Sequence, residues 1–303
     1  MTRLAFLGSP AVSAGCLRAL QAAGHDIRLV VTEADKRRSR GGAPVPTPVK
    51  AAALELGLPT SDRLSAILEV DAELGVVVAF GRLIRPPVLG SLPLVNLHFS
   101  LLPRWRGAAP VEWALLAGDE KTGVCLMEVE AGLDTGGVYA LREIPIGEDE
   151  RAEELTERLG SLGASLLVDR LAKGVGGLGD PVPQSELGGE VTYAPKLTSE
   201  DLRLDFSRPA ALLARVVRVG RAWTTFSGAR LLVHEARAEP GGVAGEPGSF
   251  VEDGGALKVA TGEGLLLLGE VQQEGRRRQG FEEWARGARL RAGERLGGRA
   301  TVG

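Results

Sequence analysis

Residues 4–31 have the sequence LAFLGSPAVSAGCLRALQAAGHDIRLVV, and this stretch decides the fold class. Its apolar residues 4–7 predict a short strand, residues 11–22 have the apolar spacing of a helix, and residues 26–31 predict a second strand. A strand, a helix and another strand in succession are typical of a parallel sheet with helices on its faces. The N-terminal end of the chain therefore predicts an α/β fold.

The same alternation continues through residue 171. Further helices are predicted over residues 50–56, 111–117 and 152–171, and further strands over residues 74–80, 94–96, 122–130 and 138–146. Ligands of open parallel sheets bind beyond the carboxyl ends of the strands. We therefore expect a functional edge at residues 80–81 and 96–98.

The composition changes after the last of these helices. Residues 173–190 are rich in Gly and Pro and predict an irregular connection. After it, a helix over 209–219 and several short strands with glycine turns predict a small β-barrel. We predict a catalytic domain over residues 1–183, a linker over 184–203 and a C-terminal domain over 204–303.

Asn96, His98 and Asp134 supply an amide, an imidazole and a carboxylate that a folded α/β chain can bring together. This set suits the movement of an acyl group between two amines through a tetrahedral intermediate. Asn96 and a protonated His98 can stabilise the oxyanion, and histidine exchanges protons readily at neutral pH. Asp134 can orient the ring. A plainer interpretation is that these polar residues satisfy the backbone at the end of a strand.

The neighbouring residues favour the catalytic interpretation. Residues 96–110, NLHFSLLPRWRGAAP, and residues 132–136, GLDTG, closely resemble the signature of the folate-dependent formyltransferases. In that family an Asn, a His two residues later and an Asp in a Gly-Leu-Asp-Thr-Gly turn carry catalysis. The resemblance therefore assigns these roles to Asn96, His98 and Asp134.

The resemblance also implies the substrates and the fold. It is greatest to the members that transfer formyl from 10-formyltetrahydrofolate to methionyl initiator tRNA. It implies a Rossmann-like formyltransferase domain with a mainly parallel sheet, followed by an OB-like barrel that holds the tRNA. It places part of the folate site at Ser100, Leu101, Leu102 and Pro103. The chain departs from many relatives at residues 220–226, where they have a Pro-rich aromatic stretch.

Residues 32–50 form an unusually long connection between a strand and a helix. Four cations within it suit contacts with a phosphate backbone, and we predict that they bind tRNA: Lys36, Arg37, Arg38 and Arg40. The family resemblance implies that this segment enters the acceptor arm and that Arg40 matters for recognition of the initiator tRNA. A floppy surface loop is the alternative. A second basic region, from Arg276 to Arg299, is either part of the tRNA surface or simply solvated.

Composition excludes other classes. The net charge of −3 argues against a protein that coats nucleic acid with its whole surface. Two cysteines and three histidines lack metal-ligand spacing, so we expect no metal and two reduced core thiols. Gly8-Ser9-Pro10 lacks the G-x-G-x-x-G pattern of a nicotinamide site. Without a secretory signal or a long apolar segment, the chain is expected to be a cytoplasmic monomer with no membrane partner.

Several rival functions share some of these features. A nucleotide-sugar N-formyltransferase can share the three catalytic residues and a barrel, but generally lacks the long basic segment. A purine-pathway formyltransferase usually lacks the barrel, and the hydrolase part of a formyltetrahydrofolate dehydrogenase heads a longer chain. A non-catalytic RNA-binding protein would explain the basic clusters but not Asn96, His98 and Asp134 together.

Overall fold

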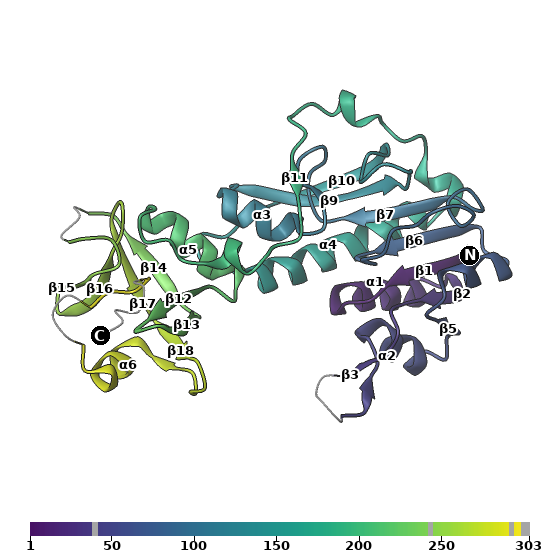
Figure 1. Cartoon of the computed structure of the whole chain (residues 1–303). Coiled ribbons are helices and arrows are strands. Elements are labelled where there is room, and N and C mark those ends of the chain that lie inside the picture. The colour runs from purple at the N-terminus through teal and green to yellow at the C-terminus, as the bar shows by residue number, and fades with distance from the viewer. Residues whose placement is uncertain (38–41, 242–244, 291–293, 298–303) are drawn as a thin grey trace. The chain divides into compact units, whose positions relative to one another are not determined.

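The computed structural model describes residues 1–37, 42–241, 245–290 and 294–297. Contacts within the chain divide it into two units (Figure 1). The first unit comprises residues 1–111, 121–146 and 154–195, and the second comprises residues 112–120, 147–153 and 196–303.

The first unit is built on a seven-stranded sheet in the order β10-β9-β7-β6-β1-β2-β5. The strands of its parallel part are β1 (Arg3–Gly8), β2 (Asp26–Val31), β5 (Thr60–Ser61), β6 (Leu74–Val78) and β7 (Leu94–His98). The remaining two, β9 (Lys121–Glu128) and β10 (Val138–Pro145), are antiparallel. The predicted α/β fold with a mainly parallel sheet is confirmed.

Helices α1 (Ala11–Ala22) and α4 (Ala152–Leu171) run along one face of this sheet (Figure 1). A Cβ on Gly163 of α4 would lie 2.4 Å from Leu97 of β7, so the helix and the strand approach closely there. Side chains alternate between the faces of a strand. Because Leu97 faces α4, its neighbours Asn96 and His98 face the other side of the sheet.

The segment that follows α4 crosses the face of the sheet that carries His98. Val182 forms a bridge with Val138 of β10, and the two-residue strand β11 (Tyr193–Ala194) pairs in parallel with β8 (Arg106–Gly107). Residues 154–195 belong to the first unit by their contacts. Short turns of 3₁₀ helix occur along the unit: η1 (Leu64–Glu69), η2 (Val175–Leu178) and η3 (Gln184–Glu186).

Three further elements of the first unit lie in or directly after its basic segment. Strands β3 (Lys36–Arg37) and β4 (Pro44–Val45) form a small antiparallel ladder, and α2 (Pro48–Glu55) follows. Thr47 caps α2 by accepting a hydrogen bond from the Lys50 N–H at 3.1 Å. Because Pro48 follows this cap, the helix begins two residues before the predicted start.

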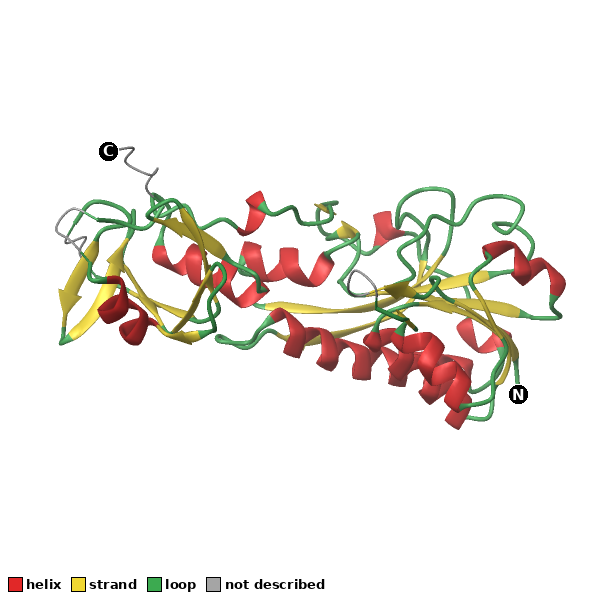
Figure 2. Cartoon of the chain, turned by 60° about the horizontal axis from the view of Figure 1, so that its bottom comes forward, coloured by secondary structure: helices red, strands yellow, loops and turns green. Residues whose placement is uncertain are grey.

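The described part of the second unit contains two four-stranded antiparallel sheets together with α-helices (Figure 2). One sheet has β12 (Trp223–Phe226), β13 (Ala229–Val233), β18 (Glu270–Gln273) and β19 (Gln279–Gly280). The other has β14 (Ala236–Glu239), β17 (Leu265–Leu268), β16 (Ala256–Ala260) and β15 (Phe250–Asp253). The helices are α3 (Pro110–Ala117), whose first two residues lie in the first unit, α5 (Ala210–Val219) and α6 (Phe281–Ala288), and a 3₁₀ turn, η4, covers Glu200–Leu202.

This unit has its own apolar core. The Phe226 and Trp284 rings meet edge to face, with centroids 4.9 Å apart, and Phe281 stacks on Trp284. The predicted small β unit is confirmed, but α6 was not predicted. Its sequence lies between basic residues, and only the spacing of Phe281, Trp284 and Ala285 indicates the buried face.

Candidate active site

The first predicted residues, Asn96 and His98, lie at the carboxyl end of β7. The strand continues to His98, two residues beyond its predicted end, because residues 95–98 pair with residues 125–128 of β9. Both side chains therefore project from the same face of the sheet. His98 is 5% exposed, whereas Asn96 is half-buried. This end of β7 is the edge where a ligand was expected.

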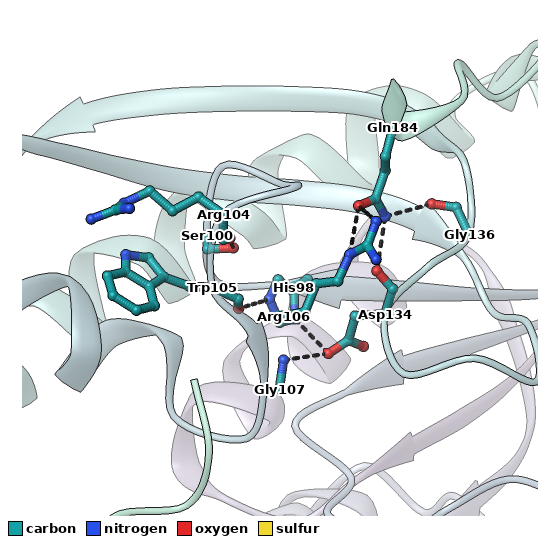
Figure 3. A network of polar contacts seen from close by, with 9 residues as sticks. All are labelled: His98, Ser100, Arg104, Trp105, Arg106, Gly107, Asp134, Gly136 and Gln184. Atoms are coloured by element: carbon teal, nitrogen blue, oxygen red, sulfur yellow. Dashed lines mark hydrogen bonds and ion pairs between the residues drawn. The ribbon is translucent and has the colours of Figure 1, made fainter. Parts of the chain in front are cut away.

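The His98 ring lies between two oxygen atoms (Figure 3). Nε2 is 2.8 Å from the backbone oxygen of Trp105, and Nδ1 is 3.7 Å from Oδ2 of Asp134. The second distance is that of an ion pair and is longer than a hydrogen bond. The structure thus brings the predicted imidazole and carboxylate together, and both ring nitrogens face acceptors.

The Asp134 turn is held in a conformation that favours glycine. Asp134 has a φ of 50°, and a non-glycine residue in this region costs about 1–3 kcal/mol. Its Oδ2 accepts a hydrogen bond from the Gly107 N–H at 2.8 Å. A Cβ on Gly136 would lie 2.1 Å from the Glu128 oxygen, so the Gly-Leu-Asp-Thr-Gly turn needs its last glycine. These contacts fix the carboxylate beside His98.

The predicted folate segment follows directly after β7. The Ser100 hydroxyl is buried and donates to the Arg104 oxygen at 2.6 Å. Leu102 belongs to an apolar cluster with Cys125, Met127 and Val138. Pro103 is also buried, and Leu101 is half-buried. The side chains of Ser100, Leu102 and Pro103 thus pack inside the loop, and the Leu101 side chain stays partly exposed.

Comparison with known proteins shows the family. Residues 2–171 match the formyl transferase family, and residues 196–289 match the formyl transferase C-terminal domain. The methionyl-tRNA formyltransferase of Solibacter usitatus is 41% identical, with 97% of this chain and 98% of that protein covered. That of Thiobacillus denitrificans is 40% identical, over 97% of this chain and 99% of that protein.

The chain belongs to the methionyl-tRNA formyltransferase family. Solved structures share its fold at low sequence identity. An N-formyltransferase from Helicobacter canadensis, in complex with folinic acid and dTDP-3-aminofucose, has a TM-score of 0.66 at 14% identity, with 90% of this chain and all of that one covered. The methionyl-tRNA formyltransferase of Clostridium thermocellum has a TM-score of 0.57 at 15% identity, over 86% of this chain and 100% of that one.

Two of the four cations predicted to bind tRNA lie outside the described residues. These are Arg38 and Arg40, whereas Lys36 and Arg37 are exposed on β3. Lys36 pairs with Glu33, Nζ to Oε2, at 2.6 Å. The base of the segment is tied by a 2.7 Å hydrogen bond between the hydroxyls of Thr32 and Thr47. Lys36 and Arg37 take no part in the hydrogen bond and the ion pair described above for His98.

Three of the late arginines of the second unit pair with acidic side chains. Arg277 pairs with Glu283 at 3.4 Å, and Arg278 pairs with Glu235 at the same distance and also with Glu270. Arg295 pairs with Glu246 at 3.3 Å. Arg291 and Arg299 are outside the described residues. The described part of this cluster therefore resembles an ordinary charged surface.

Two residues of the site were not predicted individually. Arg106 lies inside the formyltransferase signature, and Gln184 lies in the Gly- and Pro-rich stretch after α4. Figure 3 shows them bonded to each other above the Asp134 turn. Arg106 could have been found from the signature itself. No local pattern links Gln184 to a turn that lies about fifty residues earlier in the chain.

Other sequence expectations concern metals, thiols and membranes. In the ranges that the structure describes, no group of three or more His, Cys, Asp or Glu side chains could hold a metal ion. Cys16 and Cys125 are free and buried, and burial raises the pKa of these thiols to about 12 and about 11. None of the helices within the described part of the chain is long and apolar enough to span a membrane.

Proposed function

We propose that this formyltransferase moves the formyl group of 10-formyltetrahydrofolate to the α-amine of methionyl initiator tRNA. The observation that carries the proposal is the His98–Asp134 pair at the carboxyl end of β7, in a chain about 40% identical to methionyl-tRNA formyltransferases over nearly its whole length. The enzyme works as a monomer in the cytoplasm and requires no metal. Translation initiation is the process that uses its product.

His98 accepts the proton that the attacking amine loses and supplies the proton that the leaving nitrogen gains. The methionyl nitrogen attacks the formyl carbon, and the carbonyl π electrons move onto oxygen to give a tetrahedral intermediate. When this intermediate collapses, the bond between carbon and N10 of the folate breaks. The amine loses one proton and N10 gains one, so a single imidazole can accept the first and supply the second. Because Asp134 Oδ2 stays beside Nδ1 to orient the ring, the substrate must displace the Trp105 oxygen from Nε2.

Asn96 and His98 stabilise the oxyanion, and Asp134 orients the His98 ring. Asn96 projects from the same face of β7 as His98 and is half-buried, so its amide can reach a substrate bound over that face. Donors held in place before the reaction contribute more than donors that must reorganise. Positioning the two amines across one carbonyl supplies much of the remaining acceleration.

The folate donor binds against the loop formed by Ser100, Leu101, Leu102 and Pro103. The Ser100 hydroxyl is already bonded to the Arg104 oxygen, and the Leu102 side chain is buried in the apolar cluster beneath the loop. The contacts to the donor therefore come from the backbone of this loop and from the partly exposed Leu101 side chain. Replacement of Ser100 or Leu102 would act by moving the loop rather than by deleting a direct contact.

The tRNA acceptor binds the basic segment of the first unit. Lys36 and Arg37 are exposed on β3, and Arg38 and Arg40 follow them in the sequence. Long cationic side chains on an exposed ladder suit phosphates, which fix orientation but carry no sequence information. The C-terminal unit contributes further contacts to the same acceptor.

The test is transfer of labelled formyl from 10-formyltetrahydrofolate to methionine-charged initiator tRNA. A parallel reaction contains an amino-sugar nucleotide, because the Helicobacter canadensis structure with a similar fold contains one. We expect transfer to the tRNA only, and loss of transfer in His98→Ala. Transfer to the sugar alone would keep the catalytic assignment but overturn the acceptor. Absence of transfer to both would overturn the proposed function.

A further inference from the structure

Gln184 is a buried side chain whose amide joins the Asp134 turn to Arg106. It is 5% exposed and begins the short 3₁₀ turn η3. Its Nε2 donates to the backbone oxygens of Asp134 and Gly136, both at 2.8 Å. Its Oε1 accepts from Arg106, at 3.0 Å from Nε and 2.7 Å from Nη2. Figure 3 shows these four bonds converging on one amide.

Only one orientation of this amide satisfies its neighbours. A glutamine side chain has two N–H donors and one oxygen with two lone pairs, and all of them are used here. Turning the amide over would set its oxygen against two backbone oxygens and its NH₂ against a guanidinium. A buried network in which every member is satisfied fixes a geometry, whereas a partly satisfied one is costly. Gln184 therefore defines the position of the turn.

The turn carries the carboxylate proposed for catalysis, in its left-handed conformation. The two donors of Gln184 reach the backbone on both sides of Thr135, and the Gly107 N–H holds Oδ2 of Asp134 from below. Arg106, which precedes Gly107 in the chain, donates to Oε1 of Gln184 and so links these two sets of contacts. The carboxylate is thus held from its backbone and from its side chain by residues of one connected network.

We infer that Gln184 is a positioning residue for formyl transfer, acting through the Asp134 turn rather than by contact with substrate. The inference rests on the proposed role of Asp134 in that reaction. Small displacements of a catalytic group are expensive, so Gln184→Met should lower kcat roughly 10- to 100-fold. KM for both substrates should stay within about twofold, because no substrate contact is removed.

The decisive experiment is a double-mutant cycle with Asp134→Ala. If Gln184 acts through Asp134, Gln184→Met should reduce the residual rate by less than about threefold in the Asp134→Ala background. Gln21→Met on α1 is the matched control, with the same change outside the network, and should keep the wild-type rate. Equal losses in both backgrounds would overturn the inference.

A second variant covers the case in which the methionine substitution disturbs folding. Gln184→Glu keeps an acceptor for Arg106 but replaces the donors to the turn with a carboxylate oxygen. It should remain folded at the assay temperature, with a lower Tm because its carboxylate oxygen faces the backbone oxygens of Asp134 and Gly136, and it should lose at least tenfold in kcat. A stable Gln184→Glu variant with normal kcat would overturn the inference.

An NMR measurement that does not depend on enzyme activity can test this inference independently of the proposed function. The Gly107 amide proton donates to the Asp134 carboxylate, so its NMR shift and exchange rate report where the carboxylate lies. Gln184→Met should shift this proton and speed its exchange, while amides of β6 keep their protection. An unchanged Gly107 signal would overturn the inference even if wild-type transfer failed.

Discussion

The Asp134 turn and the β3–β4 ladder lie in the same unit but differ in how firmly they are held. The turn is fixed by several contacts, whereas the ladder is short and exposed. The turn is bonded to Gly107 through its side chain and to Gln184 through its backbone, and a Cβ at either flanking glycine would meet atoms within 3 Å. The ladder has two residues in each strand, and its Lys36 and Arg37 are exposed. Chemistry requires a fixed carboxylate, whereas phosphate contacts tolerate long adjustable side chains.

The largest effect should come from His98→Ala. Loss of the proton-transfer group should lower kcat about 100- to 10,000-fold and leave KM for the tRNA nearly unchanged, because the acceptor's phosphates bind elsewhere. Steady-state formyl transfer checks both values. His234→Ala in the second unit is the matched histidine control and should keep the wild-type rate. An equal rise in KM at constant kcat would show that His98 binds substrate instead.

Removal of charge from the β3–β4 ladder should change KM rather than kcat, the reverse of the effect expected for His98→Ala. Lys36→Ala combined with Arg37→Ala should raise KM for tRNA several-fold at nearly constant kcat. It should also reduce the slope of log affinity against log salt by about 1 for each cation removed. The affinity for tRNA, measured at several salt concentrations, gives this slope. Arg28→Ala, which removes an exposed cation from the same unit, is the control. An unchanged slope would remove the ladder from the tRNA surface.

Gly107→Ala tests how firmly the catalytic turn is held. Gly107 has a φ of 127°, and a Cβ there would lie 2.6 Å from the Ala194 oxygen. This last residue of β8 would have to move away from β11, so we expect a loss of about 1–3 kcal/mol in the free energy of unfolding and a lower kcat. Thermal unfolding and formyl transfer measure the two losses.

The control for that substitution is Gly15→Ala on α1. Gly15 lies inside the helix, and a Cβ there would have no neighbour within 4 Å. The change should therefore raise the free energy of unfolding by about 0.5–1 kcal/mol and keep kcat. If both alanine variants behaved alike, close packing around Gly107 would not be what holds the turn.

Local sequence patterns predicted some parts of the molecule and missed the parts that depend on contacts between distant residues. The α/β fold follows from the alternation of apolar strands and helices, and His98 and Asp134 stand in a long family signature. The extension of β7 to His98 depends on pairing with β9, and no pattern within residues 94–98 shows it. Gln184 lies in an irregular segment, and only folding brings it to Asp134. Contacts distant in sequence are thus the part that local patterns miss.

The α6 helix was missed for a different reason. Its buried face consists of Phe281, Trp284 and Ala285 within a short run flanked by arginines, so the apolar spacing spans barely two turns. The basic residues suggested an RNA surface, yet several pair with glutamates of the same unit. Charge clusters indicate the surface of a protein more reliably than they indicate what binds there.

The smallest expected effect concerns His25, which precedes β2 at the end of the sheet opposite to the site. Burial, together with the positive N-terminus, lowers the pKa of His25 below its ordinary value of 6.5, and its Nδ1 has no hydrogen-bond partner. The unfolded chain therefore takes up this proton more readily. Stability should fall as the pH drops from 6.5 towards the lower folded-state pKa, and level off below it.

His25→Gln should remove that part of the pH dependence. Thermal unfolding between pH 7.5 and about 5 compares the two proteins, and the Tm of the variant should decline less over this range. Because His25 is far from His98 along the sheet, the substitution should leave the pH profile of kcat unchanged. If His25→Gln changed the pH profile of kcat as well as that of Tm, acid unfolding would be what shapes the activity curve. The same slope of Tm in both proteins would show that His25 does not titrate with folding.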